Sequence, residues 1–432
     1  MKIPEIRFGN PQIIWYFQTL FVSLQQNYRN MKKLLIGLFA VALFVGCHKD
    51  DNEEEDPIAE RTVLIYMAAQ NNLSYWPGSG YRFAESDLKE IKKGVKNLGD
   101  NHLVIYVDKA KDPVSSYDDH KPYLLHYRKG ELKDSIPMDS TALACDPATF
   151  KTVIKKAFTD FPAKDYGLVL WGHATGWLFK NDTIASYTAR QRAYGGTNRN
   201  DVYQGSGDLW LNITTMAKTL KSLPHLKFIF ADCCNMMCAE NAYELKDVTD
   251  FFIGSPAEIP GLGAPYDVVV PAMMEKESFA TSICDQYATK YNNRVPLAVV
   301  KSSEMASLAA ATKTVLQTIK AADALDQYPN LNSLIYYLDK NLYDMNHFIM
   351  TYASEAEYNS WKQAFDKAVV YKKYAKQWDT MNHVSFFDFT MDETNFGGMS
   401  MFIPQWKLQG TDNQYIKKMG WYYAAGYDSV DW

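Results

Sequence analysis

Two stretches of the 432-residue chain decide how it folds: GLVLWGHATGW at residues 167–177 and LKFIFADCCNM at residues 226–236. Each begins with a short apolar run of the kind that forms a strand buried on both faces of a sheet. Each then passes directly into polar residues, which include His173 in the first stretch and Cys234 in the second. Because the carboxyl ends of parallel strands lie at one edge of a sheet, we expect these two side chains to face a common site.

Apolar runs alternate with helical patterns along most of the chain. Further strands are predicted at 62–67, 103–107 and 251–254, and helices at 84–97, 146–158, 211–223 and 240–246. This alternation predicts an α/β fold with a mostly parallel central sheet covered on both faces, which we place at residues 61–290.

The pattern changes beyond about residue 290. A long helix rich in Ala and Lys is expected over 303–325, further helical patterns over 330–380, and a final strand over 398–404. We therefore expect residues 291–432 to form a mainly helical C-terminal region that ends in a strand.

The composition limits the class of protein. Apolar residues make up 47% of the chain, which excludes an intrinsically disordered or collagen-like protein. The 45 Lys and Arg residues against 50 Asp and Glu give a weakly acidic balance, which argues against nucleic-acid binding. The chain contains no P-loop, G-x-S-x-G, H-E-x-x-H or EF-hand-like motif. We therefore expect no cofactor, and a requirement for calcium stays open.

The N-terminal segment is organised like a lipoprotein signal. From Met31, two lysines precede an apolar run that ends in Val45-Gly46-Cys47. The run is too short to span a bilayer as a stable helix, and a bacterial lipoprotein would be cleaved and lipidated at a cysteine behind a small residue. We expect residues 1–46 to comprise an upstream extension and the signal peptide, with Met31 the true start and Cys47 the lipidated residue. A simple membrane-anchoring segment is the alternative.

Residues 47–60 are dense in Asp and Glu, and a block of like charge stays solvated and extended. We interpret this segment as a tether. It also resembles the acidic export signal of surface lipoproteins of Bacteroidetes, although a plain spacer fits equally well. The sequence thus predicts an exported protein that a lipid holds to the outer membrane or cell surface.

A cysteine and a histidine at one site can supply a nucleophile and the group that moves its proton. Cys233 is the alternative nucleophile, and because neighbouring residues in a strand point to opposite faces, we expect only one of the two cysteines to face the site. A zinc site from Cys233, Cys234 and Cys238 is disfavoured because it lacks a paired C-x-x-C spacing. We expect Cys238 in the core, and structural roles for Cys145 and Cys284.

Several motifs resemble those of the clostripain family (C11) of cysteine peptidases, which has a caspase-like fold. The resemblance rests on the first strand and turn at 63–73, the histidine motif at 173–177, the nucleophile motif at 232–236 and the segment that follows at 243–261. Three residues depart from the family pattern: Ala174 replaces a Gly, Cys233 replaces an Ala, and Gln70 stands where an acidic residue is usual.

The resemblance implies a caspase-like α/β/α sandwich with Cys234 as the nucleophile and His173 as the base. The backbone N–H groups of Ala174 and Cys234 would form the oxyanion hole. Asp232 would line the specificity pocket, which implies cleavage of proteins or peptides after Arg or Lys at P1. Capping of the following helix is the alternative role for Asp232.

The family cuts itself between the histidine and the cysteine, so Lys180, Arg190 and Arg192 are candidate autoprocessing sites. The alternative for their segment, 178–210, is a plain surface loop. The alternative for the whole chain is a catalytically inactive surface lipoprotein that uses the peptidase fold for binding, because Ala174 and the altered flanks would fit a loss of catalysis.

Overall fold

The apolar runs form strands in the computed structural model, which describes residues 58–114, 120–179, 194–197, 209–322, 334–338, 342–379, 384–385, 392–404 and 412–432. The expected signal segment, Cys47 and the tether as far as residue 57 lie outside these residues. Lys180, Arg190 and Arg192 also lie outside them. Within the described residues, no helix has the length and apolar character needed to cross a membrane.

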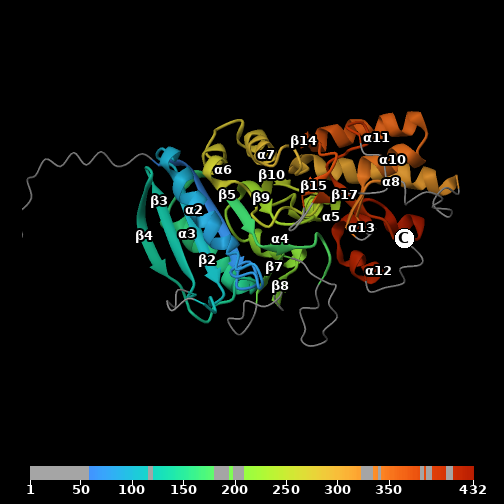
Figure 1. Ribbon diagram of the computed structural model, residues 1–432. Helices are drawn as coiled ribbons and strands as arrows, with labels where there is room; N and C mark the ends of the chain where they lie inside the picture. The colour runs from blue at the N-terminus through green and yellow to red at the C-terminus, as the bar shows by residue number, and fades with distance from the viewer. Residues whose placement is uncertain are drawn as a thin grey trace, which may run out of the picture. The chain divides into compact units, whose positions relative to one another are not determined.

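A nine-stranded sheet organises the described residues, with the strand order β14-β11-β10-β9-β5-β1-β2-β3-β4 (Figure 1). The strands are β1 (Ala59–Ala69), β2 (His102–Lys109), β3 (Tyr123–Arg128), β4 (Glu131–Pro137), β5 (Ala163–Trp171), β9 (Leu226–Asp232), β10 (Thr249–Gly254), β11 (Leu297–Lys301) and β14 (Val369–Lys373). The five central strands, from β10 to β2, pair in parallel, and the outer strands on both sides pair antiparallel. The predicted α/β fold with a mostly parallel central sheet is confirmed.

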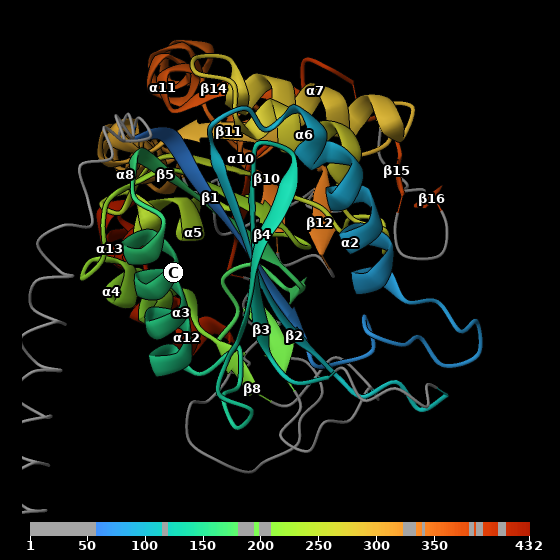
Figure 2. The same ribbon diagram turned by 90° about the vertical axis from the view of Figure 1, so that its left-hand side faces the viewer.

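Helices cover both faces of the sheet, as Figure 2 shows. In β1, Val63 and Ile65 point into one core cluster, and Leu64 and Tyr66 point into the other; all four are fully buried. The first face packs against α2 (Phe83–Gly94), α6 (Tyr266–Met273) and α7 (Phe279–Lys290). The second packs against α3 (Pro147–Asp160), α4 (Ile213–Leu220), α5 (Ala239–Leu245) and α8 (Met305–Ala321). Burial on both faces explains why these strands read as continuous apolar runs.

The start of α3 follows its sequence signal closely. Asp146 is the N-cap, and its carboxylate accepts hydrogen bonds from the backbone N–H groups of Ala148 (2.7 Å) and Thr149 (3.3 Å). Pro147 occupies the first helical position, where its missing N–H leaves no intrahelical bond unmade.

The sheet does not end near residue 290, where we expected a separate region to begin. β11 and β14 extend it, and residues from Ile58 to Trp432 form one compact unit. The long helix expected over 303–325 is α8. The helical patterns expected over 330–380 include α10 (Met345–Tyr352) and α11 (Glu355–Ala368), but also β14 and three short strands.

Two of these short strands, β12 (Tyr336–Leu338) and β13 (Leu342–Asp344), form a small sheet with β17 (Ser400–Phe402), which lies in the stretch where we expected the final strand. β15 (Trp378–Asp379) pairs with β16 (Val384–Ser385), and α12 (Asp412–Tyr415) and α13 (Gly420–Ala424) follow. The C-terminal part is therefore less purely helical than we expected, because several of its strands have only two or three residues and show no alternation in the sequence.

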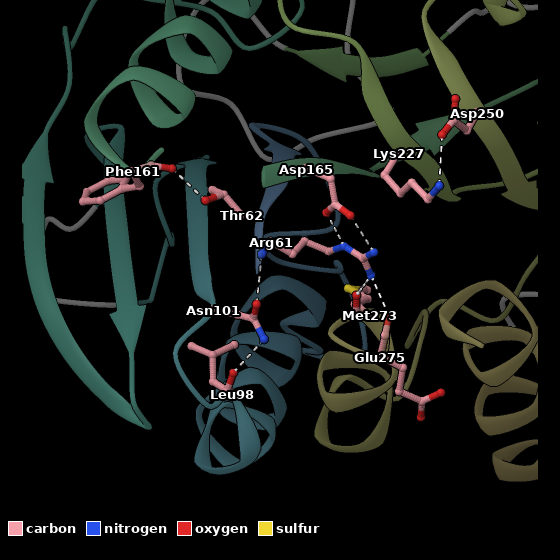
Figure 3. A network of polar contacts seen from close by, with 10 residues as sticks. All are labelled: Arg61, Thr62, Leu98, Asn101, Phe161, Asp165, Lys227, Asp250, Met273 and Glu275. Atoms are coloured by element: carbon pink, nitrogen blue, oxygen red, sulfur yellow. Dashed lines mark hydrogen bonds and ion pairs between the residues drawn. The ribbon is translucent and has the colours of Figure 1, made fainter. Parts of the chain in front are cut away.

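A buried arginine ties the sheet to α6 at the amino ends of the parallel strands (Figure 3). Arg61 is 3% exposed, and it pairs with Asp165, its register partner on β5, through Nε–Oδ1 (2.6 Å) and Nη2–Oδ2 (3.0 Å) contacts. Its Nη1 donates to the backbone carbonyls of Met273 (2.7 Å) and Glu275 (2.9 Å). The guanidinium carbon also lies 4.5 Å from the ring centroid of Phe279.

We expect Arg61→Ala to lower the free energy of unfolding by about 3 kcal/mol, because it leaves a carboxylate and two carbonyls without their partner. Urea denaturation measures this loss. Lys164→Ala is the matched control, since Lys164 forms an exposed ion pair with Glu60 on the same two strands, and its loss should leave stability close to that of the wild type. Equal stability of the two variants would contradict the assignment.

Candidate active site

The structure brings the two predicted site residues to one edge of the central sheet. β5 and β9 are adjacent parallel strands, and Trp171 pairs with Asp232 in their register. His173 and Cys234 each lie two residues beyond this pair, at the carboxyl ends of neighbouring strands. Both side chains are partly exposed. This edge is where open α/β sheets bind their ligands.

The loops that follow β5 and β9 touch each other. Gly176 in the first loop (φ 71°) and Asn235 in the second (φ 59°) both adopt the left-handed backbone conformation. A Cβ atom at Gly176 would lie 2.9 Å from the backbone oxygen of Asn235, so a larger residue would push the two loops apart. The close approach of the loops therefore depends on this glycine.

The surroundings of Cys234 favour its protonated thiol form. The backbone N–H of Ile259 donates a hydrogen bond to its Sγ (3.5 Å). Burial raises the pKa of the Cys234 thiol to about 12, and the charge of Glu258 adds to the shift. Because a protonated thiol is a weak nucleophile, attack by Cys234 requires a base that accepts its proton.

The neighbouring cysteines have different surroundings. Cys233 is fully buried on the side of the sheet that faces α3, whereas Cys234 packs against the opposite cluster. Burial also raises the pKa of the Cys233 thiol well above its usual value. Cys238, Cys145 and Cys284 are buried and free. Strand alternation thus separates the two adjacent cysteines in the way that the sequence predicted, which favours Cys234 as the reactive one.

His173 lies on β6 (His173–Ala174), a short strand outside the central sheet. Its Nε2 is 2.6 Å from Oδ1 of Asn72, in the loop after β1. Its ring centroid is 6.4 Å from that of Trp210 on β8 (Leu209–Leu211). Ala174 is not among the described residues with a positive φ, so its extended backbone does not require the glycine of the family pattern.

A short buried strand pairs with the segment that contains His173. β7 (Tyr194–Thr197) pairs antiparallel with β6, where Gly195 faces His173, and also with β8. All four of its residues are buried. A Cβ atom at Gly195 would lie 2.2 Å from Sγ of Cys145, so only glycine fits beside this core cysteine. β7 lies within 178–210, the segment for which a plain surface loop is the alternative, and its glycine pair is a turn signal rather than a strand signal.

Asp232 is 3% exposed, and neighbouring groups already bind its carboxylate. The backbone N–H of Ala264 donates to both oxygens (3.0 Å each), the hydroxyl of Tyr266 to Oδ2 (2.8 Å) and that of Tyr287 to Oδ1 (3.1 Å). Burial outweighs these hydrogen bonds and raises the pKa of Asp232 to about 6. Asp232 does not cap the following helix, because the N-cap of α5 is Cys238.

The C-terminal part of the chain forms hydrogen bonds with the residues that follow Cys234. The backbone N–H of Ser400 donates to the carbonyl of Met237 (3.1 Å), and that of Phe402 donates to Oε1 of Glu240 (2.8 Å). These bonds attach β17 to the residues that follow Cys234. Among the described residues, no group of three or more His, Cys, Asp or Glu side chains could hold a metal ion.

Comparison with known families agrees with this geometry. The model of the clostripain family matches residues 65–432, which is most of the chain. The chain belongs to the clostripain family. It is therefore a cysteine peptidase, and the predicted family and enzyme class are confirmed.

Solved structures of clostripain-family peptidases are similar over most of the chain. A secreted C11 cysteine protease from Bacteroides thetaiotaomicron, solved with an irreversible peptide inhibitor, is 29% identical with a TM-score of 0.69, and the match covers 86% of this chain and 100% of that one. An inactive zymogen C11 protease from Parabacteroides distasonis is 29% identical with a TM-score of 0.67, over 85% and 98% of the two chains. No curated protein matches the chain.

Two residues of this clostripain-family site had no assigned role in the sequence analysis. Asn72 contacts the imidazole of His173, and the charge of Glu258 acts on Cys234. Both lie in segments that matched the family, but neither stands in a periodic pattern or at a ligand spacing. An asparagine after a strand is also an ordinary turn residue, so its position alone carries no chemical signal.

Proposed function

We propose that this peptidase cuts its substrates after Arg or Lys, with Cys234 as the nucleophile and His173 as the acid–base group. One observation carries the proposal: of the five cysteines that the structure describes, only Cys234 is partly exposed, and it lies two residues beyond the Trp171–Asp232 pair, as His173 does. The raised pKa of the Cys234 thiol is the reason that a neighbouring base is needed.

In the proposed reaction, Sγ of Cys234 attacks the scissile carbonyl carbon while His173 accepts the thiol proton. The backbone N–H groups of Ala174 and Cys234 would donate to the oxygen that becomes negatively charged. His173 then gives the proton to the leaving amine, and a thioester remains on Cys234. Water, deprotonated by His173, attacks the thioester, which releases the acid and restores the thiol.

Asp232 is the proposed partner of the cationic P1 side chain. It lies two residues before Cys234, and the hydroxyls of Tyr266 and Tyr287 hold its carboxylate in one orientation. A buried carboxylate attracts a guanidinium or ammonium group strongly. The cost of keeping Asp232 charged in this pocket would then be offset when a basic side chain binds.

The decisive test of catalysis compares two adjacent cysteines. Wild-type protein should hydrolyse fluorogenic peptides that end in Arg or Lys but not in Asp. Cys234→Ala should lower kcat/KM at least about a thousandfold, since the nucleophile is gone. Cys233→Ala, a change of the same size beside it, should retain activity within a few-fold. If no peptide is cleaved even after trypsin has nicked the loop, the chain is instead a binding protein with the peptidase fold.

A second prediction concerns the pH dependence of substrate binding. Asp232→Asn should raise KM for Arg and Lys peptides by about tenfold to a hundredfold, because a hydrogen bond to a charged group is lost. In the wild type, KM should rise as the pH falls through about 6, where the raised pKa allows Asp232 to become protonated and neutral. KM of the Asn variant should stay level over this range. Equal KM values for the two proteins would rule out Asp232 as the P1 contact.

Self-processing at Lys180, Arg190 or Arg192 is the third part of the proposal. A cut at any of them leaves His173 and Cys234 on different fragments, which β6–β7 and β5–β9 pairing would hold together. Related chains include a structure described as an inactive zymogen, which fits an unprocessed form. Mass analysis under denaturing conditions should find two chains in the active protein and one in Cys234→Ala, while native mass analysis should find a single complex. Intact chains in both the wild type and Cys234→Ala would rule out self-processing.

The N-terminal segment leads us to propose export and anchoring by a lipid on Cys47. The apolar run that ends at Cys47 supports this, and the related Bacteroides thetaiotaomicron protease is described as secreted. In the same mass analysis, protein from the membrane fraction should begin at Cys47 and carry the mass of its lipid. An N-terminus elsewhere, without added mass, would contradict the anchor.

A further inference from the structure

Two neighbouring asparagines after β1 have different partners. Asn71 is buried and fixes the backbone: its Nδ2 donates to the carbonyls of Ala68 (3.0 Å) and Gly196 (2.7 Å), and its Oδ1 accepts from the N–H of Leu73 (2.9 Å). Asn72 is partly exposed, and its Oδ1 lies 2.6 Å from Nε2 of His173. The first asparagine therefore holds the turn, and the second reaches the imidazole.

We propose that Asn72 is a positioning residue for His173: its Oδ1 accepts the Nε2–H, so that Nδ1 is the nitrogen that exchanges protons with Cys234 and the leaving amine. This inference rests on the proposed role of His173 as the acid–base group. The hydrogen bond that one ring nitrogen makes decides which tautomer a neutral histidine adopts. An acceptor at Nε2 thus gives the base its lone pair on Nδ1.

The chemical character of asparagine suits this position. When His173 takes the thiol proton it becomes an imidazolium, and an amide oxygen at Nε2–H stabilises that cation through a charge-assisted hydrogen bond. A carboxylate in its place would stabilise the imidazolium so strongly that the resting histidine would hold its proton at higher pH. The site already has the carboxylates of Asp232 and Glu258 near Cys234, and a neutral acceptor adds no third negative charge.

The surroundings hold Asn72 in place. Asn71 on one side is bonded to the carbonyl of Gly196 on β7, the strand that pairs with the His173 segment. On the other side, the hydroxyl of Ser74 donates to the carbonyl of Ala69 and accepts from the N–H of Ala110 (3.1 Å). A side chain set on such a fixed turn orients its partner with little loss of entropy.

Three variants test the proposal through kcat as a function of pH, measured with an Arg peptide. Asn72→Ala should lower kcat by about tenfold to a hundredfold, the usual effect of losing an orienting partner, with little change in KM. Asn72→Asp should move the acidic limb of the kcat profile up by about one pH unit, because the carboxylate stabilises the protonated imidazole. Lys164→Ala, the control in an exposed ion pair at the amino end of β5, should leave both kcat and the acidic limb unchanged.

Retention of wild-type kcat and of the acidic limb in both Asn72 variants would overturn the proposal, while Cys234→Ala would still report on catalysis separately. A second measurement does not need turnover. In the Cys234→Ala protein labelled with ¹⁵N-histidine, and with the His173 signals assigned from His173→Gln, Nε2 should carry the proton and Nδ1 should not. A proton on Nδ1 of the neutral ring would overturn the proposal, whatever the activity.

Discussion

The parallel pairing of β5 with β9 is the constraint on which the rest of the site depends. The two strands are separated by more than 50 residues of intervening chain, yet their register places Trp171 opposite Asp232 and so fixes the level at which both loops begin. A slip of one residue would turn every side chain of the strand to the other face, which would bury Cys234 and expose Cys233. Burial on both faces of the sheet prevents such a slip, because each face carries its own complete set of apolar side chains.

Around this pair of strands, the buried carboxylates accept hydrogen bonds from neighbouring elements of the fold. Asp232 is held by groups from the loop before α6, from α6 and from α7, and Glu240 is held by the backbone of β17. Burial raises the pKa of the Glu240 carboxyl, which has no contact with solvent, to about 7. The C-terminal part of the chain therefore belongs to the architecture of the site, which a division at residue 290 would have concealed.

The sequence was sufficient for those features that depend on local periodicity or on a short motif. The run at 62–67 predicted β1, the Asp146-Pro147 pair predicted the start of α3, and alternation predicted that Cys233 and Cys234 point to opposite faces. Features that depend on distant partners escaped it. β7 reads as a turn because it contains two glycines, and it becomes a strand only because β6 and β8 flank it and Cys145 leaves no room for a side chain. The hydrogen bonds that Asp232 receives from Tyr266 and Tyr287, and the contact of Asn72 with His173, likewise join residues far apart in the chain.

The burial of β7 has a consequence for how the molecule would respond to dilution. Any break between β6 and β9 leaves two polypeptides that share one hydrophobic core, and separating them would expose both faces of the central strands to water. Such a pair does not behave like two subunits in equilibrium, because the interface between them is the interior of the domain. The two chains of the cut protein would therefore stay associated even at low concentration, because they cannot separate without unfolding the domain.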